Sequence, residues 1–141
     1  MPSKTIVQPE NVWNPQKYMK MDPTGLPWSH AVKAQGTTVY ISGQTSVDTQ
    51  GNVVGVGDMT AQVRKSISNL EQVVKAAGGR GLEDVVATTW YVTNIDDFYE
   101  RGGSTVRREM FKKDFPTSTL VEIRRLAHKD YLCEVEAIAV V

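Results

Sequence analysis

Hydrophobic and polar residues alternate with a period of two in some segments of this chain and with a period near 3.6 in others, and these two periods distinguish predicted strands from predicted helices. Short alternating or β-branched stretches, bounded by glycine, proline, asparagine or aspartate, predict strands. A turn signal at residues 48–52 also divides residues 44–54 into two short extended pieces. The predicted strands cover residues 4–7, 30–33, 37–42, 83–94, 117–126 and 131–141.

A helical period begins after Asp58, which is a good N-cap residue. Apolar residues then recur at spacings of four, three, four and three, which marks one face of a helix. The pair Gly78-Gly79 is a typical C-terminal signal. The residues of this face are Val63, Ile67, Leu70, Val74 and Ala77.

A second helix is predicted from Asp96 or Asp97 to Lys113, and Pro116 prevents it from continuing. Gly102-Gly103 interrupts it at a cost of about 1 kcal/mol per glycine, so we expect a kink or a helix in two parts. Phe98, Val106 and Met110 are expected to face inward, and Arg107 to Glu109 to form the solvated face.

The order of these elements predicts an α+β fold, in which six strands form a mixed sheet with two helices on one face. Residues 1–141 are expected to form a single domain, because this length is sufficient to bury a core. Helices on one face leave the other face either solvated or buried against another subunit.

Composition narrows the possible functions. Sixteen basic and sixteen acidic residues give a net charge of zero, which argues against a nucleic-acid surface. The single cysteine, Cys133, suits a reducing compartment, and no segment resembles a signal peptide or a membrane span. The two histidines, His30 and His128, are too far apart in sequence for a metal motif. We therefore expect a cytoplasmic protein with no nucleic-acid or membrane partner and no metal site.

The segment 8–29 has four prolines, which exclude a continuous regular element. It also holds Trp13 and Trp28, and such a segment is too apolar for a disordered tail. Two interpretations remain open: the segment covers a pocket, or it only packs against the edge of the sheet.

The last predicted strand carries two carboxylates, Glu134 and Glu136, in an otherwise apolar run. Alternate residues of a strand share one face, so both glutamates lie opposite Cys133, Val135 and Ala137. Cys133 is then expected to point into the core, where it is a poor candidate for a nucleophile. The glutamates are either a solvated patch or a functional feature of the outer face.

Several motifs together resemble the Rid family, also called the YjgF/YER057c/UK114 family. The resemblance covers roughly residues 28–141, with the motifs in the same order as in the family. They are VYISGQ at 39–44, VGD at 56–58, AAGG at 76–79, DVVATTWYVTNIDDF at 84–98, FKKDFP at 111–116 and CEVEAIAV at 133–140.

The resemblance implies a chorismate-mutase-like fold that assembles as a homotrimer with small-molecule sites in clefts between subunits. It also implies hydrolysis of reactive enamines or imines to a keto acid and ammonia, without a cofactor. If the segment 8–29 covers a pocket and not only the edge of the sheet, this pocket would be such a cleft between subunits.

Carried over by position, the resemblance makes Glu134 the catalytic residue, which directs water to the imine carbon. Glu136 is its structural or solvated neighbour. The substrate-binding positions that the resemblance implies are Ser42, Gly43, Trp28, Ser104, Ser118, Thr119 and Leu120.

One departure from the family concerns the substrate carboxylate. The resemblance places an arginine that grips this carboxylate where the chain has Ser118. A hydroxyl in place of a guanidinium loses about 1.5–3 kcal/mol of charge-assisted hydrogen bonding. Trp28 also stands where the family has tyrosine, and His30 where glutamine is frequent; we expect His30 to make ordinary hydrogen bonds.

Three functions stay open at this point. The first is a deaminase for a different enamine, for example an unsaturated 2-amino acid such as an aminomuconate. The second is a trimer that binds a small metabolite without catalysis. The third, an RNA-cleaving activity, is disfavoured by the neutral charge and by the lack of interleaved basic and aromatic residues.

Overall fold

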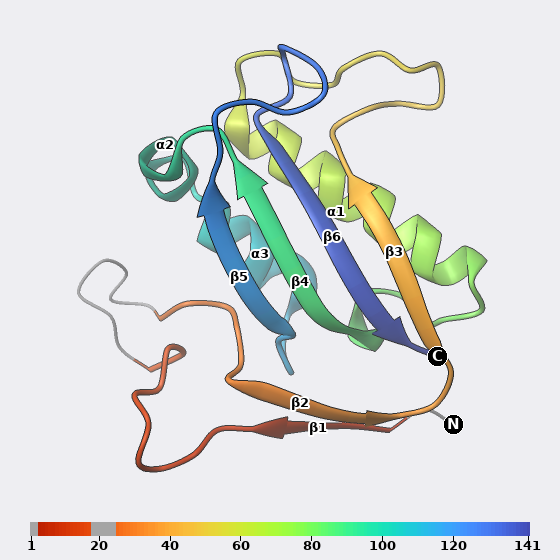
Figure 1. Cartoon of the computed structure of the whole chain (residues 1–141), viewed down its shortest axis with the longest axis vertical. Coiled ribbons are helices and arrows are strands. Elements are labelled where there is room, and N and C mark those ends of the chain that lie inside the picture. The colour runs from red at the N-terminus through yellow and green to blue at the C-terminus, as the bar shows by residue number, and fades with distance from the viewer. Residues whose placement is uncertain (1–2, 18–24) are drawn as a thin grey trace.

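The computed structural model describes residues 3–17 and 25–141, and its elements form two layers (Figure 1). In the described residues, six strands and the helices follow the predicted order. The strands are β1 Ser3–Val7, β2 Ala31–Gln35, β3 Thr38–Gln44, β4 Val85–Val92, β5 Thr117–Glu122 and β6 Cys133–Val140. The helices are α1 Met59–Ala76, the short 3₁₀ helix η1 Leu82–Asp84, α2 Ile95–Glu100 and α3 Gly103–Phe111.

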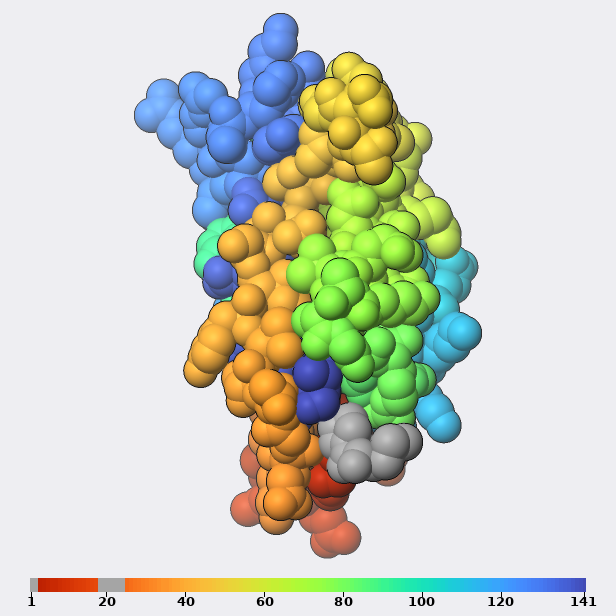
Figure 2. All heavy atoms as spheres, turned by 90° about the vertical axis from the view of Figure 1, so that its right-hand side faces the viewer, coloured from red at the N-terminus to blue at the C-terminus, as the bar shows by residue number. Residues whose placement is uncertain are grey.

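The larger sheet is mixed and has the strand order β3-β6-β4-β5. Strand β6 is antiparallel to both of its neighbours, whereas β4 and β5 are parallel and joined through α2 and α3. The helices lie behind this sheet in Figure 1, on one face only. Figure 2, turned by 90°, shows the edge strand β3 beside α1. The α+β class and the one-sided helix layer are therefore confirmed.

The prediction that all six strands belong to one sheet was wrong. Strands β1 and β2 form a separate antiparallel pair, so four strands remain in the main sheet. The chain turns at Gly36, whose φ of 150° lies outside the range that other residues favour. After this turn Thr37 exchanges two backbone hydrogen bonds with Val141. The turn lets β2 leave the plane of β3 and pair with β1.

Helix α1 begins and ends as its sequence signals predict. The Asp58 side chain accepts a hydrogen bond from the Ala61 N–H, at 3.0 Å. At the other end, the N–H groups of Gly78 and Gly79 donate to the carbonyls of Lys75 and Val74, which is the Schellman arrangement. Ala77, expected on the buried face, is instead exposed, because the helix ends at Ala76.

The second helix is in two parts, α2 and α3, as the glycine pair predicts. Gly102 has φ of 83°, a left-handed conformation that only glycine adopts at little cost. A Cβ on Gly103 would lie 2.7 Å from ring carbons of Phe98. The glycines thus let the two helical parts turn and pack closely against each other.

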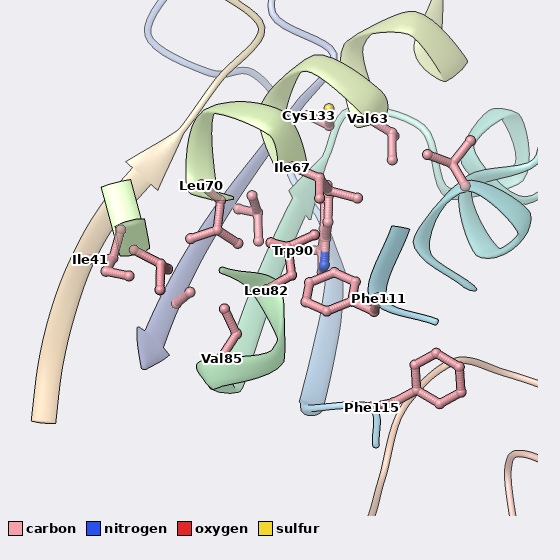
Figure 3. Close-up of a cluster of buried hydrophobic side chains, with 14 of the residues drawn as sticks. Ile41, Val63, Ile67, Leu70, Leu82, Val85, Trp90, Phe111, Phe115 and Cys133 are labelled. Carbon is pink, nitrogen blue, oxygen red and sulfur yellow. The ribbon is translucent and has the colours of Figure 1, made fainter. Parts of the chain in front are cut away.

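The core lies between the sheet and the helices (Figure 3). Trp90 of β4 and Phe98 of α2 are fully buried, with ring centroids 5.9 Å apart. The predicted face of α1 packs against them, and each fully buried aliphatic side chain contributes about 1.5–3 kcal/mol. The opposite face of the sheet is uncovered, and Tyr40 there is 81% exposed.

Candidate functional site

The Glu134 carboxylate lies directly over Gly43, at an irregularity where β3 pairs with β6. A Cβ on Gly43 would be 1.8 Å from Glu134 Oε1, so the space above this glycine belongs to the carboxylate. Gly43 does not have a positive φ. Close approach, and not backbone conformation, is therefore the reason for a glycine here. Ser42, Gly43 and Glu134, three predicted site residues, are together in the structure.

Glu136 lies on the same uncovered face and has a different environment. Its Oε1 accepts a hydrogen bond from the Tyr91 hydroxyl at 2.8 Å. This hydrogen bond raises the pKa of Tyr91 above its ordinary value. Glu136 is thus tied to a neighbouring strand, as expected for a structural neighbour of Glu134. Both glutamates face away from the helices, as the period of two predicts.

A hollow of about 400 Å³ crosses β3, β6 and β4 on this uncovered face. Tyr40, Ser42, Thr89 and Glu136 contribute polar groups to it, and Ile138 an apolar wall. Ser42 joins this hollow to the Gly43–Glu134 contact. The uncovered face therefore offers both a carboxylate and space for a small molecule.

Strand β5 presents its predicted site residues to two different faces. It is parallel to β4, with Ser118 beside Thr88 and Leu120 beside Trp90. Thr88 and Trp90 are buried against the helices, so Ser118 and Leu120 face the same layer. Thr119 is exposed on the uncovered face. Within one chain, Ser118 and Leu120 are therefore separated by the sheet from Glu134.

Arg107 of α3 lies beside Ser118 and is 3% exposed. Its Nη1 donates to Ser118 Oγ at 3.3 Å, and its Nη2 donates to Ser104 Oγ at 3.4 Å. The guanidinium carbon is 5.0 Å from the ring centroid of Phe98 and 6.0 Å from that of Trp90, within the range of cation–π contacts. A buried cation thus connects two of the predicted substrate-binding serines.

The prediction that Arg107 to Glu109 form a solvated face was wrong for Arg107. Glu109 is exposed and pairs with Arg64 on α1, as expected for a surface residue. Residues four apart share one side of a helix, and Gly103, Arg107 and Phe111 are all buried. The same spacing of four is present in the sequence, but it does not by itself indicate that an arginine is buried.

Trp28 lies near the beginning of β5. The adjacent Ser29 donates its N–H to the Pro116 carbonyl at 3.1 Å and its hydroxyl to the Phe115 carbonyl at 2.6 Å. The Trp28 ring meets those of Trp13 and His30 edge-on, with centroids 5.9 and 5.2 Å apart. The residues of segment 8–29 around Trp28 therefore pack at the same end of the sheet as Ser118.

Other residues in or next to segment 8–29 make further hydrogen bonds near Trp28. Arg108 of α3 donates to the Gly25 carbonyl, and residues 18–24 lie outside the described residues. The backbone N–H of His30 donates to Gln8 Oε1 at 2.8 Å, and its Nε2 lies 2.5 Å from the Trp13 carbonyl oxygen. His30 makes the ordinary hydrogen bonds that we expected.

Cys133 is fully buried, on the opposite side of β6 from Glu134, as predicted. Burial raises the pKa of its thiol to about 12, so the thiolate that a nucleophile requires is absent near neutral pH. Among residues 3–17 and 25–141 no cluster of three or more His, Cys, Asp or Glu could hold a metal ion. No helix in this part of the chain is long and apolar enough to cross a membrane.

The chain is similar to known proteins in both sequence and structure. The family model described as Endoribonuclease L-PSP matches residues 19–141. A protein of Salmonella typhimurium named 2-iminobutanoate/2-iminopropanoate deaminase is 39% identical, over 74% of this chain and 80% of its own length. It supports the assignment of imine deaminase chemistry to this group of proteins.

Two solved structures are similar along most of the chain. One is a Rid-family protein of unknown function, YyfB from Yersinia pestis, with a TM-score of 0.82, 25% identity and 98% coverage of both chains. The other is TdcF of E. coli with bound serine, with a TM-score of 0.65, 32% identity, and coverage of 82% of this chain and 88% of that one. The match of the family model to most of the chain, together with these likenesses, shows that the chain belongs to the Rid (YjgF/YER057c/UK114) family.

Proposed function

We propose that this chain is a hydrolytic deaminase of a reactive imine or enamine, and that Glu134 directs the attacking water. The observation that carries the proposal is the Glu134 carboxylate held over Gly43, beside Ser42 and the hollow on the uncovered face. A carboxylate in this position can orient a water molecule and exchange protons with it. The name of the Salmonella relative supports the choice of substrate class.

The reaction needs only water and proton transfers. Water adds to the imine carbon, Glu134 accepts a proton from it, and the C=N double bond becomes a single bond. Glu134 returns this proton to the nitrogen, which gives a carbinolamine. It then takes the proton of the carbinolamine hydroxyl and passes it to the same nitrogen, so that the C–N bond breaks, ammonia leaves and the C=O bond of the keto product forms. Atoms and charges balance with no cofactor. Positioned acid–base catalysis of this kind contributes about 10²–10⁴-fold in rate.

The proposed site is completed by a second copy of the chain in a homotrimer. Within one chain the sheet separates Glu134 from Ser118 and Leu120, so a single copy does not bring the predicted site residues together. The uncovered face, with Tyr40 81% exposed, is available for contact with another subunit. A cleft between copies would bring Glu134 of one copy to the Ser118 side of its neighbour. Sedimentation velocity tests this directly, and a monomer at assay concentration would contradict it.

Two kinds of substrate are proposed. The relative's name specifies short 2-imino acids, whereas the resemblance to the broader family also suggests an unsaturated 2-amino acid such as an aminomuconate. Trp28 near the beginning of β5 offers a flat apolar surface that suits a conjugated substrate. Both kinds of substrate therefore belong in the first assay.

The test is ammonia release from freshly generated 2-aminoacrylate, 2-iminobutanoate and 2-aminomuconate. We expect the wild type to exceed the uncatalysed rate and Glu134→Gln to lose about 10²–10⁴-fold of this acceleration. Glu109→Gln is the matched control, because Glu109 is an exposed glutamate of α3 outside the hollow, and it should retain most of the activity. Equal losses in both variants would contradict the role of Glu134.

A second candidate function is binding of a small metabolite without turnover. It is favoured by Ser118, which replaces the arginine that the resemblance implies, and by the serine bound in the TdcF structure. Saturable binding of serine or a keto acid, with no acceleration of any imine, would establish it. An RNA-cleaving activity that survives Glu134→Ala would contradict both the deaminase site and the metabolite-binding site.

A further inference from the structure

We infer that Asn69 and Gln62 of α1 are positioning residues for Glu134. Their side-chain amides hold the end of β3 and the beginning of β6, the two strands whose pairing places Gly43 under the Glu134 carboxylate. The inference rests on the proposed function, because it concerns the geometry of the same carboxylate. Both amides belong to a helix on the covered face of the sheet, so they act through the strands and not on the substrate.

The contact beneath the Glu134 carboxylate depends on one extra residue in β3. Ile41 of β3 pairs with Ala137 of β6. The next pair is Gln44 with Val135, so three steps along β3 match two steps along β6. This is a β-bulge, which interrupts the regular ladder and bends the bulged strand. Because Gln44 is also the last residue of β3, the position of the bulge depends on what holds the chain directly after it.

Asn69 makes this contact directly after β3. Its Nδ2 donates to the Thr45 carbonyl at 3.0 Å and to the Val47 carbonyl at 2.9 Å. The Val47 N–H also donates to the Thr45 carbonyl at 3.0 Å, so residues 45–47 form a tight turn that the amide closes. The amide of asparagine has two N–H groups, which matches these two carbonyls. The turn begins two residues after Gly43, and its attachment to α1 fixes where the bulged strand ends.

Gln62 makes the corresponding contact directly before β6. Its side chain is fully buried, and its Oε1 accepts a hydrogen bond from the Leu132 N–H at 2.8 Å. Its Nε2 donates to the Asp130 carbonyl at 2.8 Å and to the Gly55 carbonyl at 3.0 Å. Leu132 stands two residues before Glu134, so the amide fixes where β6 begins.

The two amides act from one helix. Residues seven apart lie on the same side of an α-helix, two turns or about 10.5 Å from each other. Helix α1 runs behind β3 and β6 in Figure 1, and its N-cap and C-terminal hydrogen bonds are both formed. A single rigid element therefore sets the end of β3 relative to the beginning of β6, and with it the overlap of Gly43 and Glu134.

The test uses Asn69→Leu, which keeps the branched shape of the side chain and removes both donors. The kcat and KM for 2-iminobutanoate are measured for this substitution in the wild-type and in the Glu134→Gln background. Asn94→Ala is the matched control, because Asn94 also makes a local side-chain hydrogen bond, as the N-cap of α2. The melting temperature of each protein shows how much stability each substitution removes.

We expect Asn69→Leu to lower kcat by about ten- to a hundredfold, since a misplacement of about 1 Å costs up to about that factor. KM should change little, because the amide lies on the covered face of the sheet. The loss should almost vanish in the Glu134→Gln background, and Asn94→Ala should keep the wild-type kcat. Equal losses in both backgrounds would overturn the inference, because Asn69 would then act only through the stability of the fold.

A second measurement does not depend on turnover, and it separates this inference from the proposed function. Glu134→Gln removes the charge above Gly43 and should shift the ¹H–¹⁵N resonance of the Gly43 amide. The same substitution should produce a much smaller shift in Asn69→Leu, or in the milder Asn69→Ser if Asn69→Leu does not fold. A shift of undiminished size would overturn the inference even in an active enzyme. A diminished shift in a protein without imine turnover would support the positioning and remove the proposed function.

Discussion

Replacing Gly43 by alanine should disable the site while leaving the fold intact. The new Cβ would lie 1.8 Å from Oε1 of Glu134, 2.6 Å from Cδ and 2.8 Å from Cγ. All three atoms belong to a side chain on the uncovered face, so the carboxylate can move away without disturbing the core. Gly43 has no positive φ, and alanine therefore brings no such backbone strain.

The size of the effect follows from these distances. Ordinary contact with a Cβ begins at 3.4 Å, so Oε1 must move from 1.8 Å to at least that distance, about 1.6 Å further away. A misplacement of about 1 Å can cost about 10²-fold in rate, and we expect kcat/KM for imine hydrolysis to fall by about that factor. A shifted rotamer costs about 0.5–1.5 kcal/mol, so the melting temperature should fall by only a few degrees.

The assay is a double-mutant cycle of Gly43→Ala and Glu134→Gln, with ammonia release and thermal melting measured for each protein. If alanine acts through the carboxylate, its effect on kcat/KM should almost vanish in the Glu134→Gln background. Equal losses in both backgrounds would refute the reasoning. So would a Gly43→Ala enzyme with full activity, because the carboxylate would then not need its observed position.

Three other predictions concern stability and reactivity. Burial disfavours the Asp84 carboxylate, but hydrogen bonds from the Arg80 side chain and N–H outweigh this and hold its pKa below the ordinary value of 3.8. Asp84→Asn should therefore lower the free energy of unfolding by urea by about 2 kcal/mol at pH 7. This difference between variant and wild type should disappear as the pH falls below 3.8, because the wild-type carboxylate is then protonated, and a difference that grows in acid would contradict the assignment. Asp58→Ala should lower the free energy of unfolding by about 1 kcal/mol, since the Ala61 N–H loses its cap, and an unchanged value would show that water replaces the carboxylate. Cys133 should resist iodoacetamide at pH 8 in the folded protein and react at once in urea, which mass spectrometry can follow.

Much of the fold could be predicted because its signals are local. The N-cap at Asp58, the glycine pair after α1 and the interruption at Gly102 each act within one turn of helix, and the structure has all three. The separate pairing of β1 with β2 could not be predicted in this way. It depends on the direction of the chain after Gly36, and strand pairing over such distances leaves no local pattern.

The candidate site also has features that local sequence patterns predict and features that depend on the pairing of distant segments. The period of two placed Glu134 and Glu136 on the outer face, and the sequence motifs gave the family that the comparisons show. The contact between Glu134 and Gly43 depends on the register of β3 and β6, which no single segment contains.

Arg107 is the clearest case of what only the tertiary structure decided. In the sequence it is one of two adjacent arginines on a helix, and charged residues on helices are usually solvated. The packing of α3 against β4 and β5 brings its guanidinium to Phe98, Ser104 and Ser118. Sequence alone thus determined which residues face together along each element, because that follows from the helical and strand periods. Which elements meet, and so which charge reaches which serine, was fixed by packing between segments far apart in the chain.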